Sequence, residues 1–298
     1  MSTVSTAEKK DLFLKTGDWR FLNEIMPDYA NDREVIIKAI NLDGTYISYA
    51  SDSLKADKEI VMLAVKNNGN AFNDINEKFW SDTDVIFAAR NTEIGPGMDS
   101  MELIDEQLFS DVNFVKKLLN SVDDSTHDYE VIEILERAGK EVTSNKELML
   151  SAISANYESY QYIDESLKSD KLFFIEAEKL CACLLRYADK DWQSDREVVE
   201  IAVERNGIEL KFAADKFKSD REMVLKAVKT QPFILEDVDE KFRSDFEIAK
   251  LAVTSHGHAI KLLPEDLQSN QEIKDAVETW KIEFKNCDSR RWTRIFEA

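Results

Sequence analysis

The chain contains little glycine, proline, histidine or cysteine. Its 298 residues include 8 Gly, 4 Pro, 3 His and 3 Cys. Sheet-rich folds need many Gly and Pro turns, so this scarcity favours helices over strands. The three cysteines (Cys181, Cys183 and Cys287) cannot form a disulfide framework. The chain also lacks a phosphate-binding Gly-rich loop, a Gly-x-Ser-x-Gly elbow and a His-Glu-x-x-His pair, so no familiar motif points to an enzyme.

Long hydrophobic runs are absent as well. No stretch approaches the roughly 18 consecutive apolar residues that a membrane-spanning helix needs. The segment from Met1 to Lys10 has no apolar core after a basic stretch, so no secretory signal is visible. Together with the few cysteines, these observations predict a cytoplasmic protein, with export as a host-directed effector left open.

Positive charge is in short supply. The chain has 39 Lys and Arg against 59 Asp and Glu, a formal net charge of −20. Direct binding to a nucleic-acid backbone is therefore not expected, because that affinity comes from Lys and Arg neutralising phosphates. The acidic charge either keeps a large surface soluble, or forms a face that recruits a basic protein partner or mimics nucleic acid.

A phrase of the form Ser-Asp-Arg-Glu-apolar-apolar-x-x-Ala recurs along the chain. With its Asp or Asn as the marker, it recurs every 25 residues in two series, which are separated by a marker at Asp111 that comes four residues late. The series are Asp32, Asp57 and Asp82, and then Asn145, Asp170, Asp195, Asp220, Asp245 and Asn270. Self-similarity at this period is typical of stacked repeats in which each unit packs only against its neighbours.

The unit that starts at Asp195 predicts the local structure. Ser194 and Glu197 have the spacing of a Ser-x-x-Glu capping box at a helix start. Apolar residues at +3, +4, +7 and +8 from the marker form one helical stripe, and position +7 is Ala in eight units. Gly207, at +12, is expected to end the helix as a C-terminal glycine. A second, short helix with core positions at +15, +18 and +22 then follows, and a turn closes the unit.

The pattern from Ser194 to Asp220 resembles a family of bacterial and protist repeats known as a domain of unknown function, number four-one-one-six. The resemblance is strong from Trp192 to Trp280, good from Asn31 to Asp82 and weak between them. It implies a helical array, and it brings no activity or catalytic residues with it.

Two insertions interrupt the repeat in consecutive units. Counting back from Asp111 and Asn145 places four extra residues within 91–100 and nine extra residues around 121–129, both in the bend between two helices. Insertions of this kind collect on binding edges, although an irregular joint between two regular half-arrays would also explain them. We predict a partner-binding site there, formed by Ile94, Pro96, Met98, Asp123, Asp124, His127, Asp128 and Tyr129.

Weaker signals do not predict a metal or cofactor. The Asp and His residues of the second insertion lack the Gly and the final Glu of a calcium loop. His256 and His258 alone supply too few ligands for zinc. Cys181 and Cys183 are interpreted as small core residues, because positions i and i+2 of a helix do not face each other and a redox pair is therefore not expected.

The sequence thus predicts an all-α fold, an α-solenoid (superhelical array) of about nine 25-residue helix–bend–short-helix repeats with terminal caps. Its segments are an N-terminal cap repeat (1–30), regular repeats (31–90), divergent repeats with inserted bends (91–143), regular repeats (144–280) and a C-terminal basic amphipathic cap (281–298). The first functional hypothesis is a non-catalytic protein-interaction scaffold, a monomer or part of a hetero-complex, that binds through a concave face and the inserted bends. The alternatives are an acidic decoy that mimics nucleic acid, and an enzyme with an unfamiliar site at the repeat break.

Overall fold

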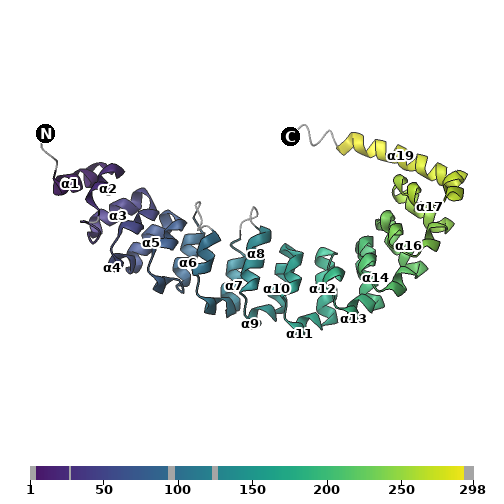
Figure 1. The fold of residues 1–298 in the computed structure, drawn as a ribbon, viewed down its shortest axis with the longest axis horizontal. Helices are drawn as coiled ribbons and strands as arrows, with labels where there is room; N and C mark the ends of the chain where they lie inside the picture. Colours follow the sequence, from purple (N-terminus) through teal and green to yellow (C-terminus); the bar gives the residue numbers. More distant parts are fainter. Residues whose placement is uncertain (1–4, 27, 93–97, 123–126, 292–298) are drawn as a thin grey trace. The chain divides into compact units, whose positions relative to one another are not determined.

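The computed structural model describes residues 5–26, 28–92, 98–122 and 127–291, and within these ranges it contains helices and no strands. The chain divides into two compact units: residues 1–126 with 137–142, and residues 127–136 with 143–298. Each is a stack of helical repeats (Figure 1). The prediction of an all-α repeat array is confirmed.

Each repeat begins with a longer α-helix. In the first unit, after the N-terminal pair α1 (Thr6–Thr16) and α2 (Trp19–Ile25), these are α3 (Arg33–Leu42), α5 (Lys58–Asn67), α6 (Thr83–Arg90) and α7 (Val112–Leu119). In the second unit they are α10 (Lys146–Ala155), α12 (Lys171–Cys181), α14 (Arg196–Arg205), α16 (Arg221–Thr230), α17 (Phe246–Ser255) and α19 (Gln271–Arg291). Helix α8 (His127–Glu136), which also belongs to the second unit, does not begin a repeat.

Short helical segments complete the repeats. The 3₁₀ helices are η1 (Gly44–Tyr49), η2 (Gly69–Asp74), η3 (Glu77–Phe79), η4 (Met98–Leu103), η5 (Glu106–Ser110), η6 (Tyr157–Tyr162), η7 (Leu185–Tyr187), η8 (Gly207–Phe212), η9 (Pro232–Glu236), η10 (Glu240–Arg243) and η11 (Gly257–Leu262). The short α-helices are α4 (Asp52–Lys55), α9 (Lys140–Thr143), α11 (Glu165–Lys168), α13 (Lys190–Ser194), α15 (Asp215–Lys218) and α18 (Glu265–Ser269). The predicted short second helix is therefore usually a 3₁₀ helix, and a further single turn follows it.

The 25-residue markers coincide with helix starts. In the unit at Asp195, helix α14 begins at the next residue, and Val198, Val199, Ala202 and Val203 are all buried. In the second unit, α10, α12, α14, α16 and α17 lie side by side in chain order (Figure 1). The predicted pitch and the predicted apolar stripe are confirmed for this unit.

The capping-box prediction was wrong by one residue. The Asp195 carboxylate, not the Ser194 hydroxyl, caps α14, and it accepts hydrogen bonds from the backbone N–H groups of Glu197 (3.0 Å) and Val198 (3.1 Å). Asp is as good a helix N-cap as Ser. Because Asp195 accepts both N–H groups, the Glu197 side chain is not needed for capping and has another role. A true capping box occurs in α1, between Ser5 and Glu8.

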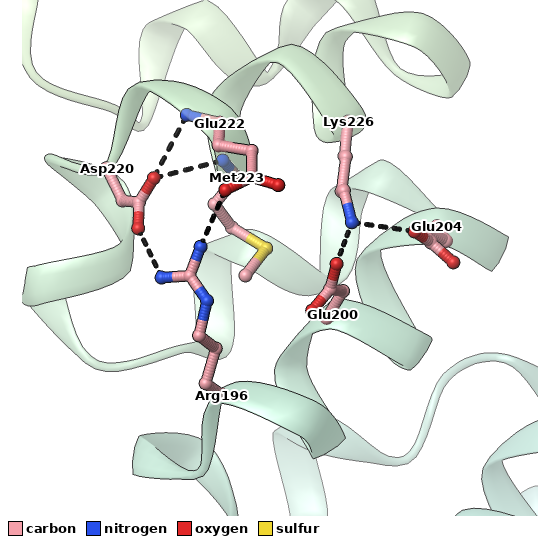
Figure 2. Close-up of polar contacts among 7 residues, drawn as sticks. All are labelled: Arg196, Glu200, Glu204, Asp220, Glu222, Met223 and Lys226. Carbon is pink, nitrogen blue, oxygen red and sulfur yellow. Dashed lines mark hydrogen bonds and ion pairs between the residues drawn. The ribbon is translucent and has the colours of Figure 1, made fainter.

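That other role is an ion-pair ladder between repeats (Figure 2). Arg196, directly after its own marker, contacts both acidic residues of the next repeat: Asp220 at 2.6 Å and Glu222 at 2.9 Å. The same three-residue arrangement recurs at Arg33 with Asp57 and Glu59, Lys58 with Asp82 and Asp84, Lys171 with Asp195 and Glu197, and Arg221 with Asp245 and Glu247. The repeated Asp-Arg-Glu residues therefore join each repeat to the next one through ion pairs.

The glycine at +12 also serves packing between repeats. Helix α14 ends two residues before Gly207, as the glycine pattern predicted, but Gly207 is not left-handed: Asn206 caps the helix with extended backbone, and Gly207 opens η8. A Cβ on Gly207 would lie 2.1 Å from the carbonyl oxygen of Ala227 in the next repeat. Glycine is needed here because two backbones touch, and the Ala at +7 supplies the other side of that contact.

Candidate functional site

The predicted site residues fall partly on described segments. Ile94, Pro96, Asp123 and Asp124 lie outside the described residues. Met98 is the first residue of η4, and His127 and Asp128 are in the first turn of α8. Tyr129 is the residue of this group whose side chain is described, and it is 80% exposed. The structure therefore neither brings the predicted residues together nor separates them.

The insertions lie where the repeat count placed them, with one difference. The first falls between the end of α6 at Arg90 and the start of η4 at Met98. In the second, α8 runs for ten residues where regular units have a six-residue 3₁₀ helix such as η8. Part of the insertion therefore lengthens a helix rather than a bend, because Val131, Ile134 and Leu135 are buried at helical spacing.

Arg137 stabilises the divergent part of the first unit, and sequence reasoning missed it. Its guanidinium donates to the carbonyl oxygens of Met101 and Ile104 (2.7 Å for the latter) and to the Glu106 carboxylate at 3.0 Å. It also lies 3.9 Å from the centre of the Phe109 ring. Nothing in the sequence indicated these long-range contacts, because Arg137 is simply a charged residue that follows an apolar helix.

The paired histidines form an aromatic cluster. The His256 ring lies 4.8 Å from Trp280 and 5.1 Å from Phe233, and His258 lies 5.3 Å from Trp280. Trp280 also covers Gly257, where a Cβ would come within 2.4 Å of the indole. In the part of the chain that the structure describes, no group of three or more His, Cys, Asp or Glu residues could hold a metal.

The repeat that starts at Asp170 is irregular at its bend. Helix α12 continues to Cys181 and ends at Ala182, whose backbone is left-handed with φ 54° and ψ 41°. That conformation costs a non-glycine residue about 1–2 kcal/mol. The prediction that both cysteines are core residues of one helix was wrong: Cys183 lies beyond the helix end, and both thiols are half-buried. The Cys181 thiol donates to the Ala177 carbonyl oxygen at 3.6 Å.

Two fully buried glutamates support this bend. The Glu178 carboxylate accepts the backbone N–H of Leu184 at 2.9 Å, and Glu209 from the next repeat accepts that of Leu185 at 3.0 Å. Burial raises the pKa of Glu178 to about 8 and that of Glu209 to about 7, more than these hydrogen bonds lower them. The Oε1 atom of each carboxylate is buried with no hydrogen-bond partner.

These glutamates carried a sequence signal that the repeat analysis did not use. Glu178 occupies position +8, where six other units have Val or Ile: Ile40, Val65, Ile153, Val203, Val228 and Val253, whereas the units that start at Asp82 and Asn270 have Arg90 and Glu278 there. Glu209 occupies position +14, where other units have Ala71, Ile234 and Ala259. Both columns are mostly apolar, although position +14 is also Tyr46 and Ser159 in two units, so an acidic residue there indicates a place where the backbone needs a side-chain acceptor.

The described helices include none that is long and apolar enough to cross a membrane. No curated protein and no solved structure matches the chain. One family model, described as "Domain of unknown function (DUF4116)", matches five times, over residues 32–89, 145–193, 173–218, 195–243 and 220–268. The matches span more than half of the chain and stop on both sides of the divergent repeats. The chain therefore belongs to this family of helical repeats.

Proposed function

We propose that the chain is a non-catalytic scaffold that binds a protein partner through the exposed surface of its repeats and its inserted segments. The family carries no described activity, so the proposal depends on which side chains the fold leaves unused.

The regular units use most of their repeated residues internally. Apolar positions such as Val198 and Val199 are buried, and the Asp-Arg-Glu residues pair across repeat boundaries. Side chains that contribute nothing to stacking are the ones available to a partner. This favours a search for large apolar side chains outside the repeat pattern.

Tyr129 is the observation on which the proposal rests. At 80% exposure it is the most exposed of the large apolar side chains within the described residues. It lies in the first turn of α8, opposite the buried face of Val131, Ile134 and Leu135, so the helix that carries it is firmly packed. Tyrosine on a fixed support is a frequent anchor in protein interfaces, because it adds large contact area at little entropic cost.

Site-specific photo-crosslinking in the full chain tests the proposal. A photoreactive amino acid replaces Tyr129 in one variant and Leu172, which is 69% exposed near the start of α12, in the control. We expect a protein from the source organism's lysate to crosslink at 129, to be lost on Tyr129→Ala, and not to crosslink at 172. Crosslinking at 172 alone would place binding on the regular repeats, and no crosslink at either position would contradict the proposed site.

Salt separates this function from the acidic-decoy alternative. Apolar contacts around Tyr129 should survive ~0.5 M NaCl, because salt at that strength screens charges but leaves apolar burial intact. A partner that is released by that salt and displaced by DNA would support the decoy instead.

A further inference from the structure

The bend after α12 brings two thiols together on an anchored backbone. Cys181 is the last residue of the helix and Cys183 follows the left-handed Ala182. Two peptide steps reach at most about 7 Å when fully extended, and disulfides join Cα atoms about 4.4–6.8 Å apart. A left-handed turn at the intervening residue shortens the span into that range. Cys181 Sγ donates to the Ala177 carbonyl oxygen at 3.6 Å, and each thiol shifts the pKa of the other, so the two sulfurs lie close together.

We propose that Cys181 and Cys183 form a redox-active dithiol that a hydroperoxide oxidises to an intrachain disulfide. The site lies outside the partner-binding region proposed above. Both side chains are half-buried and are therefore reachable by a small oxidant.

The reaction balances without any further reagent. The Cys183 thiolate attacks the terminal oxygen of the hydroperoxide, the O–O bond breaks, and the product is a Cys183 sulfenic acid with release of the alcohol, or of water from hydrogen peroxide. The Cys181 sulfur then displaces the sulfenic hydroxyl, which leaves as water with the Cys181 proton. Two electrons pass from the sulfurs to the peroxide. The hydrogen bond from Cys181 lowers the pKa of Cys183, which favours Cys183 as the attacking sulfur.

The surrounding contacts fix the two sulfurs for this ring closure. The main chain holds Cys181 within α12, since the Ala182 N–H donates to the Glu178 carbonyl at 2.8 Å. On the other side, the Glu178 and Glu209 carboxylates hold the N–H groups of Leu184 and Leu185. Asn206 donates to the Ala182 carbonyl at 3.1 Å. Holding both reactants in place favours the intrachain reaction over crosslinking between chains.

The unpartnered Oε1 atoms of Glu178 and Glu209 are the second observation at this site. They are buried acceptors beside the bend, and both carboxylates interact electrostatically with Cys183. The remaining charge facing the thiols is Arg186, which favours the Cys183 thiolate.

Thiol counting on the full reduced chain tests the proposal, with hydrogen peroxide as the probe. The chain has 3 cysteines; alkylation and intact mass should show all three free before treatment, and Cys287 alone after it. The mass should fall by two hydrogens, at a rate independent of protein concentration, and a dithiol reductant should restore it. The Cys287→Ser variant should behave in the same way, with loss of two thiols.

The single variants supply the decisive control. In Cys181→Ser, Cys183 should stop at the sulfenic acid, which dimedone traps, and no disulfide should form within the chain. A peptide map that links Cys287 to either partner, or a wild-type chain that keeps two or more alkylatable thiols under peroxide that oxidises free glutathione, would overturn the proposal.

Discussion

Glu178 should make the stability of the second unit depend on pH, and Glu178→Gln should remove much of that dependence. The folded chain holds this proton up to a pKa of about 8, whereas the ordinary value is 4.5. Below pH 4.5 the group is protonated in both states and carries no penalty. As the pH rises towards 8, the unfolded chain releases the proton and the folded chain does not, so the free energy of unfolding falls.

The size of this loss of stability follows from the difference between the folded pKa of about 8 and the ordinary value of 4.5. At about 1.4 kcal/mol per pH unit the upper bound is about 5 kcal/mol. Relaxation around a newly buried charge lowers this figure, and we expect about 2–4 kcal/mol between pH 5.5 and pH 8.5. The groups that face Glu178 are Glu209 and Cys183, whose charges raise its pKa, and Arg205, which lowers it.

Urea denaturation followed by circular dichroism measures the effect. Wild type, Glu178→Gln and the control Glu197→Gln are compared at pH 5.5, 7.0 and 8.5. Glutamine keeps an acceptor for the Leu184 N–H and cannot ionise, so the excess of its midpoint over that of wild type should be small at pH 5.5 and much larger at pH 8.5. Glu197 is 66% exposed, so the control variant removes the same charge from the surface instead of from the core. Parallel pH profiles for wild type and Glu178→Gln would refute the reasoning.

Three further predictions concern stacking and the proposed interface. Gly207→Ala forces a Cβ against the Ala227 carbonyl and should cost about 1–3 kcal/mol; an unchanged melting temperature would contradict this contact. Arg196→Ala breaks the half-exposed pairs with Asp220 and Glu222, and should lower the urea midpoint slightly in 50 mM NaCl and much less in 1 M NaCl; an equal loss in both salts would mean that packing, not charge, is lost. Tyr129→Ala should change the free energy of unfolding by less than about 0.5 kcal/mol, and a larger loss in a urea titration would show that the side chain is packed rather than available.

The sequence was sufficient for the pitch, the helix starts and the buried stripe, because each repeat solves the same packing problem and so repeats the same residues. The sequence was less informative about which side chain makes each contact. Ser194 and Asp195 are both good caps, and only coordinates show that Asp195 accepts the N–H groups. Similarly, Gly207 fits a helix-end pattern, while the actual cause is a carbonyl in the next repeat, 20 residues away along the chain.

The irregular bend was harder to foresee for a physical reason. In a helix, the side chains of residues i and i+2 point in different directions. That rule applies to Cys181 and Cys183 only if both belong to the same helix. The left-handed Ala182 breaks the assumption, and nothing in its side chain announces such a conformation. Glu178 and Glu209 could have been noted by comparing columns of the repeat, because both columns are mostly apolar, although Arg90, Glu278 and Ser159 interrupt them.

The ion-pair ladder has a consequence for how such a chain can change in length. Every rung joins a cation to acids 24 and 26 residues further on. Duplication or loss of 25 residues therefore regenerates all partners on both sides of the junction, wherever in a regular unit the break occurs. A gain or loss of 24 or 26 residues would instead leave a cation facing the wrong neighbours. The spacing makes whole-repeat duplication the tolerated way for the array to grow, because each added repeat forms the same ion pairs with its neighbours.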